Sequence, residues 1–211
     1  MPVAVPNYRL TTAQTLLKHP AHTEDLLSFL EFVLTWKGPF SSGRAAYDPG
    51  KLYVIGHSCS AHMLSSIYLK PTDSNINVTL IPSPQLLSST RGLIFSEGLY
   101  DLDLTLRSFP GYKEWFIANT FGDRASYGEF NVAKYGLRKG GEKIRWLLLH
   151  SQDDTLVDQA QLDTMNEHLS ELFGSELVSI DWSSIRGEHN DVLKSDVYYK
   201  IVTSFVRSDT L

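Results

Sequence analysis

A serine stands where a short apolar run meets a helical pattern. Segment 55–60 reads Ile-Gly-His-Ser-Cys-Ser. Residues 51–55 predict a buried parallel strand, and residues 61–70 predict the helix that follows. Gly56 and Ser60, two positions before and after Ser58, are small and allow the tight strand-to-helix turn that exposes a nucleophile. The turn indicates a nucleophilic serine at 58 with backbone N–H groups near it for an oxyanion, although Ser60 stands where such turns usually have glycine.

Two later loops carry an acid and a base that could activate this serine. The loop 150–158 reads His-Ser-Gln-Asp-Asp-Thr-Leu-Val-Asp, so either Asp153 or Asp154 could orient a histidine. The same acids could instead only cap the helix that starts near residue 157. The loop 187–191 reads Gly-Glu-His-Asn-Asp and makes His189 the candidate general base.

The order of these residues strengthens the hypothesis. A serine hydroxyl is a poor nucleophile until an imidazole takes its proton, and a carboxylate must hold that imidazole in the right tautomer. Serine first, then an acid after a late strand, then a histidine after the last strand is the order found in α/β hydrolases. Each of the three candidate loops follows a predicted strand, as this chemistry requires.

The elements that must position these loops alternate along the chain. Strands that alternate with helices predict an α/β-hydrolase fold, with a mostly parallel sheet and helices on both faces, in a single domain spanning residues 1–211. Residues 102–140 are aromatic and irregular, and we expect short helices there that form a lid over the sheet. The strands are predicted at 3–8, 51–55, 92–96, 145–150 and 176–182, and the helices at 24–36, 61–70, 157–173 and 192–206, the first of them capped by Thr23.

Composition narrows the class of protein. The 211 residues are 42% hydrophobic and 20% charged, as in ordinary globular proteins, and the net charge of −5 argues against a nucleic-acid partner. A single cysteine excludes an internal disulfide framework, and the first residues show no signal-peptide pattern. The most apolar predicted helix is too short to span a bilayer. We therefore expect a cytoplasmic protein with a small-molecule substrate and no membrane partner, and the sequence leaves a homodimer open.

Other residues that could do chemistry have simpler explanations. Cys59 is expected to pack or to donate its backbone N–H to an oxyanion, rather than to act as a thiol nucleophile. His19 and His22 lack a carboxylate or cysteine at metal-ligand spacing, so we expect no zinc site. The aromatic residues between 109 and 130 are typical of core or lid packing and could stack against an aryl substrate.

Several stretches, distributed over the whole chain, resemble those of a known family. The sequence is similar to the kynurenine formamidase (arylformamidase) group of α/β hydrolases. The resembling stretches are Asn7-Tyr-Arg-Leu10, His19-Pro-Ala-His22, Glu24-Asp25, Gly56-His-Ser58, Glu97-Gly-Leu-Tyr-Asp101, His150-Ser151 with Asp154, and Gly187-Glu-His-Asn-Asp-Val192.

The resemblance implies a function. It makes Ser58 the nucleophile, Asp154 the acid and His189 the base, a choice between the two adjacent acids that spacing leaves open. The implied reaction is hydrolysis of N-formyl-L-kynurenine to L-kynurenine and formate, a step of tryptophan catabolism, through a formyl-serine intermediate and without a cofactor or metal. A general carboxylesterase acting on small acyl esters is the alternative within the same chemistry.

One part of the family pattern is missing from this sequence. In the family, a strand that ends in a His-Gly-Gly loop precedes the Asn-Tyr-Arg-Leu stretch, and that loop supplies oxyanion-hole N–H groups. No such stretch stands before Met1 here. The resemblance therefore implies an N-terminally shortened fold in which the Cys59 N–H is the remaining oxyanion donor. Either strand 3–8 moves into the place of the missing strand, or the sequence is a shortened form with impaired catalysis, since losing one donor costs about 10²–10³ in rate.

Overall fold

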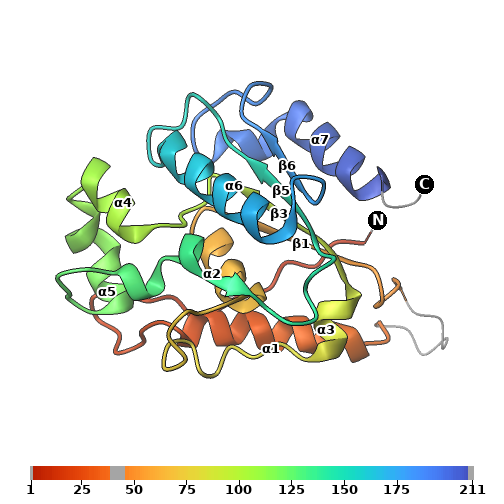
Figure 1. The fold of residues 1–211 in the computed structure, drawn as a ribbon, viewed down its shortest axis with the longest axis horizontal. Helices are drawn as coiled ribbons and strands as arrows, with labels where there is room; N and C mark the ends of the chain where they lie inside the picture. The colour runs from red at the N-terminus through yellow and green to blue at the C-terminus, as the bar shows by residue number, and fades with distance from the viewer. Residues whose placement is uncertain (1, 39–45, 209–211) are drawn as a thin grey trace.

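A four-stranded parallel sheet forms the centre of the molecule (Figure 1). The computed structural model describes residues 2–38 and 46–208. The strands are β1 (Leu52–His57), β3 (Thr90–Ser96), β5 (Arg145–Leu149) and β6 (Val178–Asp181), in the order β1-β3-β5-β6. All three neighbouring pairs are parallel, so every strand ends at the same edge of the sheet. The predicted α/β-hydrolase sheet is confirmed for these four strands.

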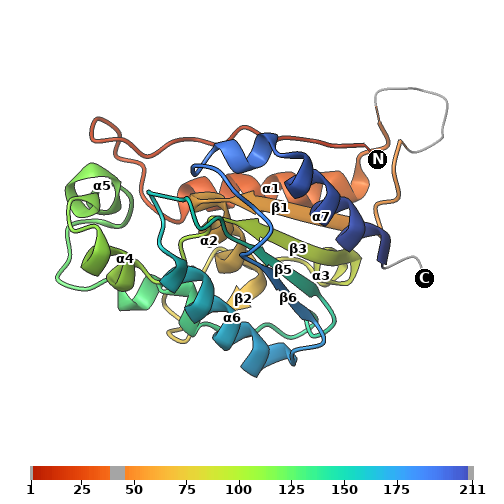
Figure 2. The same cartoon turned by 90° about the horizontal axis from the view of Figure 1, so that it is seen from above.

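Helices cover both faces of the sheet, and the strand sequences explain why. Side chains of a strand alternate between the two faces. Leu93 and Phe95 of β3 join a cluster with α1 (Ala21–Thr35), α2 (Cys59–Tyr68), α3 (Pro84–Ser89) and α6 (Gln159–Phe173). Ile94, between them, joins a second cluster with α7 (Asp196–Arg207). Figures 1 and 2 show α1 and α7 on opposite sides of the sheet.

The segment between β3 and β5 folds into short helices, as its composition predicts. Its own apolar cluster consists of Leu102, Ile117, Phe121, Tyr127 and Phe130, separate from the two clusters on the sheet. A two-stranded antiparallel ladder of β2 and β4, which no sequence pattern indicated, ties the end of this segment to the end of α2. The small elements are β2 (Leu69–Lys70), β4 (Gly136–Leu137), α4 (Leu102–Ser108), α5 (Ala118–Phe121), the π-helix η1 (Lys113–Ile117) and the 3₁₀ helices η2 (Gly128–Phe130), η3 (Val132–Lys134) and η4 (Asp191–Lys194).

Three details of the predicted elements are wrong. Residues 3–8 form no strand, and within the described residues β1 pairs with β3 alone. Pro6 cannot donate to a ladder, and the chain is attached to α1 just after this segment, where Arg9 pairs with Asp25 at 2.8 Å. Thr23 lies inside α1, which begins two residues earlier. The last predicted helix is interrupted at Ser195, whose hydroxyl caps α7 by accepting the N–H of Val197.

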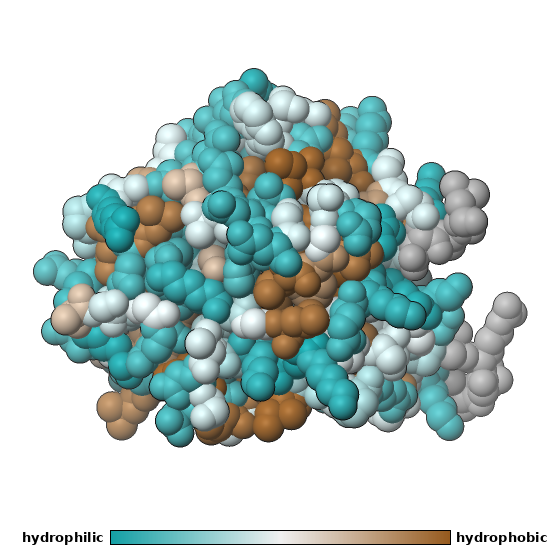
Figure 3. Space-filling view, in the orientation of Figure 1, coloured by the Kyte–Doolittle hydropathy of each residue, from teal (hydrophilic) through white to brown (hydrophobic). Residues whose placement is uncertain are grey.

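One face of the molecule is largely polar. Figure 3 shows one face that is hydrophilic over most of its area, with apolar atoms gathered in a few patches. Within residues 2–38 and 46–208, no helix has the length and apolar character needed to cross a membrane.

Three histidines lie close together, His19 in the N-terminal segment, His22 in α1 and His62 in α2. The rings of His19 and His22 lie 5.2 Å apart, and those of His19 and His62 lie 6.0 Å apart, measured between centroids. Burial lowers the pKa of His62 to about 3 and of His22 to about 4, and it lowers the pKa of His19 well below the usual value. The cluster is therefore neutral at neutral pH, because desolvation disfavours the imidazolium form.

Acidification is expected to destabilise the protein through this histidine cluster. In the unfolded chain the imidazoles take up protons below about pH 6.5, whereas in the folded protein they stay neutral to a much lower pH. The unfolded state then binds more protons, so the free energy of unfolding falls as the pH drops. Each histidine contributes up to about 1.4 kcal/mol per pH unit. Urea unfolding between pH 7 and pH 5 measures the slope.

Two variants separate protonation from packing. His62→Leu removes one titrating group and should flatten the slope. Phe121→Leu changes a ring 5.4 Å from that of His62 and should lower stability at every pH while leaving the slope unchanged. Equal slopes in wild type and His62→Leu would contradict the prediction.

Candidate active site

The ends of the four strands lie in one row across the sheet. His57 pairs with Ser96, Ser96 with Leu149, and Leu149 with Asp181. The residues that follow these four positions therefore leave the sheet at one edge. This register brings together loops that are far apart in the sequence, including the three predicted to carry the serine, the acid and the histidine.

Ser58 occupies a strained turn between β1 and α2. Its φ of 55° and ψ of −123° are unusual for a residue with a side chain, and its N–H bonds the carbonyl of Ser96 at 2.9 Å. A Cβ at Gly56 would lie 2.9–3.0 Å from atoms of α2, so only glycine permits this close approach of strand and helix. Cys59 is the first residue of α2, where helix N–H groups have no partner within the helix. The turn presents a hydroxyl beside a possible oxyanion donor.

His189 and Asp154 form a short, buried pair. The Nδ1 atom of His189 lies 2.7 Å from Oδ2 of Asp154, and their side chains are 8% and 0% exposed. The other Asp154 oxygen accepts the N–H groups of Leu156 at 2.8 Å and Val157 at 3.0 Å. Burial opposes ionisation of Asp154, but hydrogen bonds from His189, Glu97 and these N–H groups outweigh it and lower its pKa to about 2. Asp154 is thus a carboxylate that can hold an imidazole in one tautomer.

Asp153 does a different job from its neighbour. Its side chain is half exposed, and Oδ2 accepts the N–H of Gly187 at 3.0 Å. The Ser151 hydroxyl donates to the carbonyl of the same glycine at 2.7 Å. Gly187 has a φ of 121°, a backbone conformation that residues with a side chain rarely adopt. The two contacts hold the loop after β6 against the loop after β5. The adjacent acids therefore have different partners: Asp153 contacts Gly187, and Asp154 contacts His189.

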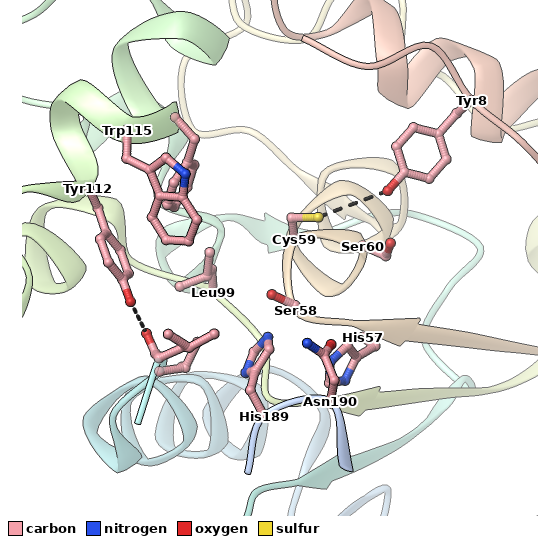
Figure 4. A pocket seen from close by; sticks show the side chains of 13 residues that line it. Tyr8, His57, Ser58, Cys59, Ser60, Leu99, Tyr112, Trp115, His189 and Asn190 are labelled. Carbon is pink, nitrogen blue, oxygen red and sulfur yellow. Dashed lines mark hydrogen bonds between the residues drawn. The ribbon is translucent and has the colours of Figure 1, made fainter. Parts of the chain in front are cut away.

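An open pocket of about 460 Å³ contains both the serine and the histidine. Figure 4 shows Ser58 next to the ring of His189 at this pocket, with Tyr8 on the far side of Cys59. Aromatic side chains from the segment after β3 form one wall. The lining residues are Tyr8, His57, Ser58, Cys59, Ser60, Leu99, Tyr112, Trp115, Phe116, Leu156, Val157, His189 and Asn190.

Two residues that line the pocket, Tyr8 and His57, make contacts that the sequence did not predict. Tyr8 points its hydroxyl at the sulfur of Cys59, 4.0 Å away, from the segment that was predicted as a strand. His57 bonds the Ser96 hydroxyl through Nδ1 at 3.0 Å, and its ring centroid lies 4.7 Å from that of His189. Burial and the nearby His189 lower the pKa of His57 to about 4, so it adds no positive charge at neutral pH. His57 therefore forms an uncharged part of the pocket wall.

A second acid lies beside the pair. Among the described residues, one carboxylate oxygen each of Glu97 and Asp154 and a ring nitrogen of His150 come within 4.8 Å of one another. His19 and His22 lie in the separate histidine cluster, away from this group. Glu97 drew notice in the sequence only as part of a family stretch, because a single glutamate after a strand carries no signal of burial.

Comparisons with known proteins agree with the fold. No family model matches the chain. The kynurenine formamidase of Scheffersomyces stipitis is 24% identical over 207 residues, covering 90% of this chain and 70% of the relative. That of Meyerozyma guilliermondii is 26% identical over 169 residues, covering 77% and 57%. The solved structure of a truncated carbohydrate esterase from gut microbiota superposes with a TM-score of 0.68 at 14% identity, covering 96% of this chain and 72% of the other.

The fold and these similarities define the class. The protein is an α/β hydrolase. Within that class, its sequence is similar to those of kynurenine formamidases, at 24–26% identity. The chain spans 70% and 57% of the lengths of the two formamidases just named.

The different contacts of the two adjacent acids predict different costs of removal. Asp154→Ala leaves two backbone N–H groups and a buried histidine without their acceptor, which should cost about 1–3 kcal/mol of unfolding free energy. Asp153→Ala removes one partly exposed hydrogen bond and an exposed ion pair with Arg186, and it should cost about 1 kcal/mol or less. Urea unfolding of both variants at pH 7 measures the difference. An Asp153→Ala cost equal to or above that of Asp154→Ala would show that the assignment of contacts is wrong.

Proposed function

We propose that the protein is a serine hydrolase that removes the formyl group from an aryl formamide, with N-formyl-L-kynurenine as substrate and Ser58, His189 and Asp154 as its triad. The observation that carries the proposal is the 2.7 Å contact of His189 with a buried Asp154 in the same pocket as the strained Ser58. The kynurenine formamidases among its relatives supply the substrate class.

The reaction follows from the roles of these groups. His189 accepts the hydroxyl proton of Ser58 as the oxygen attacks the formyl carbon, while Asp154 stabilises the imidazolium. The Cys59 N–H donates to the oxyanion that forms. The C–N bond then breaks, His189 protonates the departing aryl amine, and a formyl-serine ester remains. Water, deprotonated by His189, attacks this ester and releases formate, which restores the Ser58 hydroxyl.

The shape of the pocket supports an aromatic substrate. Tyr112, Trp115 and Phe116 form the wall beside Ser58, with Leu99 between this wall and the sheet. The Tyr112 and Trp115 rings meet edge to face at 5.1 Å, and the Tyr112 hydroxyl donates to the carbonyl of Leu156 at 2.9 Å. A small formyl group needs little room near the serine, so the remaining volume can take the aryl part.

The test compares two substrates and three variants of the full chain. N-formyl-L-kynurenine should be hydrolysed in preference to 4-nitrophenyl acetate, with kynurenine as product. Ser58→Ala should abolish both reactions and labelling by a fluorophosphonate probe. Asp154→Asn should lower kcat by about 10⁴, the loss that follows when a triad acid can no longer orient its histidine. Asp153→Asn is the matched control and should keep activity within about tenfold of wild type.

Each result decides one part of the proposal. Labelling of wild type but not of Ser58→Ala supports a nucleophilic serine, whereas no labelling of folded wild type contradicts it and favours a non-catalytic form. Turnover of the ester without turnover of the formamide would overturn the formamide assignment and leave a general carboxylesterase, the alternative that the esterase fold of the structural neighbour favours.

Removal of the aromatic wall tests the aryl part separately. Trp115 is 62% exposed and lines the pocket, so Trp115→Ala should leave folding and the attack by Ser58 intact. Loss of one aromatic contact should raise KM for the aryl formamide by about tenfold, with less effect on ethyl acetate, which has no aromatic ring to contact the wall. Steady-state kinetics on both substrates give the ratio. An unchanged KM for the formamide would exclude this wall from substrate binding.

A further inference from the structure

Glu97 is a buried acid that the proposed reaction does not use. It is the first residue after β3, and it is 0% exposed. Its φ of 50° lies in the left-handed region, which costs energy for a residue with a long side chain. The loop around it is held by Gln161, whose amide oxygen accepts the N–H groups of Tyr100 at 2.7 Å and Asp101 at 2.9 Å. The structure thus keeps a glutamate in a strained conformation at the centre of the strand-end row.

The carboxyl group of Glu97 faces the loop that carries Asp154. Its Oε1 accepts the N–H of Ser151 at 2.9 Å, and its Oε2 lies 2.7 Å from Nδ1 of His150. Asp154 is the third member of the group whose donor atoms lie within 4.8 Å. Glu97 therefore contacts the start of this loop and lies next to the Asp154 carboxylate, which in turn contacts His189.

Two neighbouring carboxyl groups in a buried site are not both ionised at low cost, so one proton is shared between them. Burial raises the pKa of Glu97, the hydrogen bond with His150 lowers it, and the adjacent Asp154 raises it; the net shift is upward. The pKa of Asp154 is lowered, so of the two carboxyl groups Glu97 is the one that binds a shared proton more readily. Besides His150 and Asp154, the titratable groups that face Glu97 are Tyr100 from its own loop and Tyr198 from α7, and burial raises the pKa of both. Neither tyrosine supplies a charge at neutral pH.

We propose that Glu97 is a positioning residue whose carboxyl proton hydrogen-bonds the Asp154 carboxylate, fixes its orientation and moderates its pull on the imidazole of His189. The catalytic consequence rests on the proposed function, whereas the contact itself does not. A neutral donor takes up part of the negative charge of Asp154, so less of it stabilises the imidazolium form of His189. Glu97 thereby keeps the histidine available as a base at neutral pH.

The test uses one variant that keeps the donor and one that removes it. Glu97→Gln retains an N–H donor for Asp154 and an oxygen for the Ser151 N–H, and it cannot ionise. Glu97→Leu has a similar volume and no polar group. In Glu97→Leu, kcat should fall by up to about 10²-fold with KM unchanged, and the acid limb of kcat/KM should move up by about one pH unit. Glu97→Gln should stay within a few-fold of wild-type kcat, with its acid limb close to that of wild type.

Two readouts keep this test separate from the proposed function. Thermal unfolding of each variant shows whether a loss of kcat reflects unfolded protein. The proton NMR resonance of the Nδ1–H that bridges His189 and Asp154 reports their contact without any turnover. It should shift or broaden in Glu97→Leu and return toward its wild-type position in Glu97→Gln. If wild type hydrolyses neither substrate, the proposed function fails, and this resonance still decides the role of Glu97.

The outcomes that overturn the proposal are specific. A folded Glu97→Leu with wild-type kcat, acid limb and resonance would show that Glu97 does not act on Asp154. A Glu97→Gln variant that loses as much kcat as Glu97→Leu would show that an ionised carboxylate, not a neutral donor, is needed. Should Glu97→Leu fail to fold, Glu97→Gln alone decides, because near-wild-type kcat supports the donor and a large loss contradicts it.

Discussion

The register of the parallel sheet is the constraint on which the site depends. Because His57, Ser96, Leu149 and Asp181 lie in one row, the chain leaves four strands at one edge within a short distance. A slip of one residue would turn each side chain to the other face and shift the following loop. The alternation of Leu93, Ile94 and Phe95 between two apolar clusters makes such a slip costly. The core on both faces therefore sets the positions of the residues that do chemistry.

At that edge of the sheet, the negative charge of Asp154 must be stabilised although its side chain is buried. Asp154 is fully buried and remains ionised because four hydrogen-bond donors surround it. An unpaired buried carboxylate would shift its pKa and become neutral, and a neutral acid could not stabilise an imidazolium. The proton on Glu97 and the N–H groups of the loop thus belong to the same arrangement as the histidine. What holds Asp154 in place also determines how strongly it acts on His189.

The sequence predicted this site to the extent that strands can be recognised locally. Apolar runs such as Leu147–Leu149 indicate buried strands, and the loop after each run is where a parallel sheet places reactive groups. The three candidate residues could therefore be assigned to loops that meet at one edge of the sheet. The choice between Asp153 and Asp154 could not come from spacing, because contacts with Gly187 and His189 separate them. The supposed strand at 3–8 failed for a related reason, since an extended pattern does not specify a partner strand.

The parts of the pocket that would recognise a substrate come from outside the sheet. The aromatic wall lies in the segment between β3 and β5, and the N-terminal segment is fastened to the end of that wall. The His19 N–H bonds the carbonyl of Thr120 at 2.8 Å, the hydroxyls of Thr11 and Thr120 meet at 2.8 Å, and the Lys18 amine donates to Asn119. Tyr8, in the same N-terminal segment, reaches the pocket from the opposite side. Substitutions in these segments can change the shape of the pocket while Ser58, Asp154 and His189 stay in the loops at the strand ends, so the pocket wall and the proposed catalytic residues can vary independently.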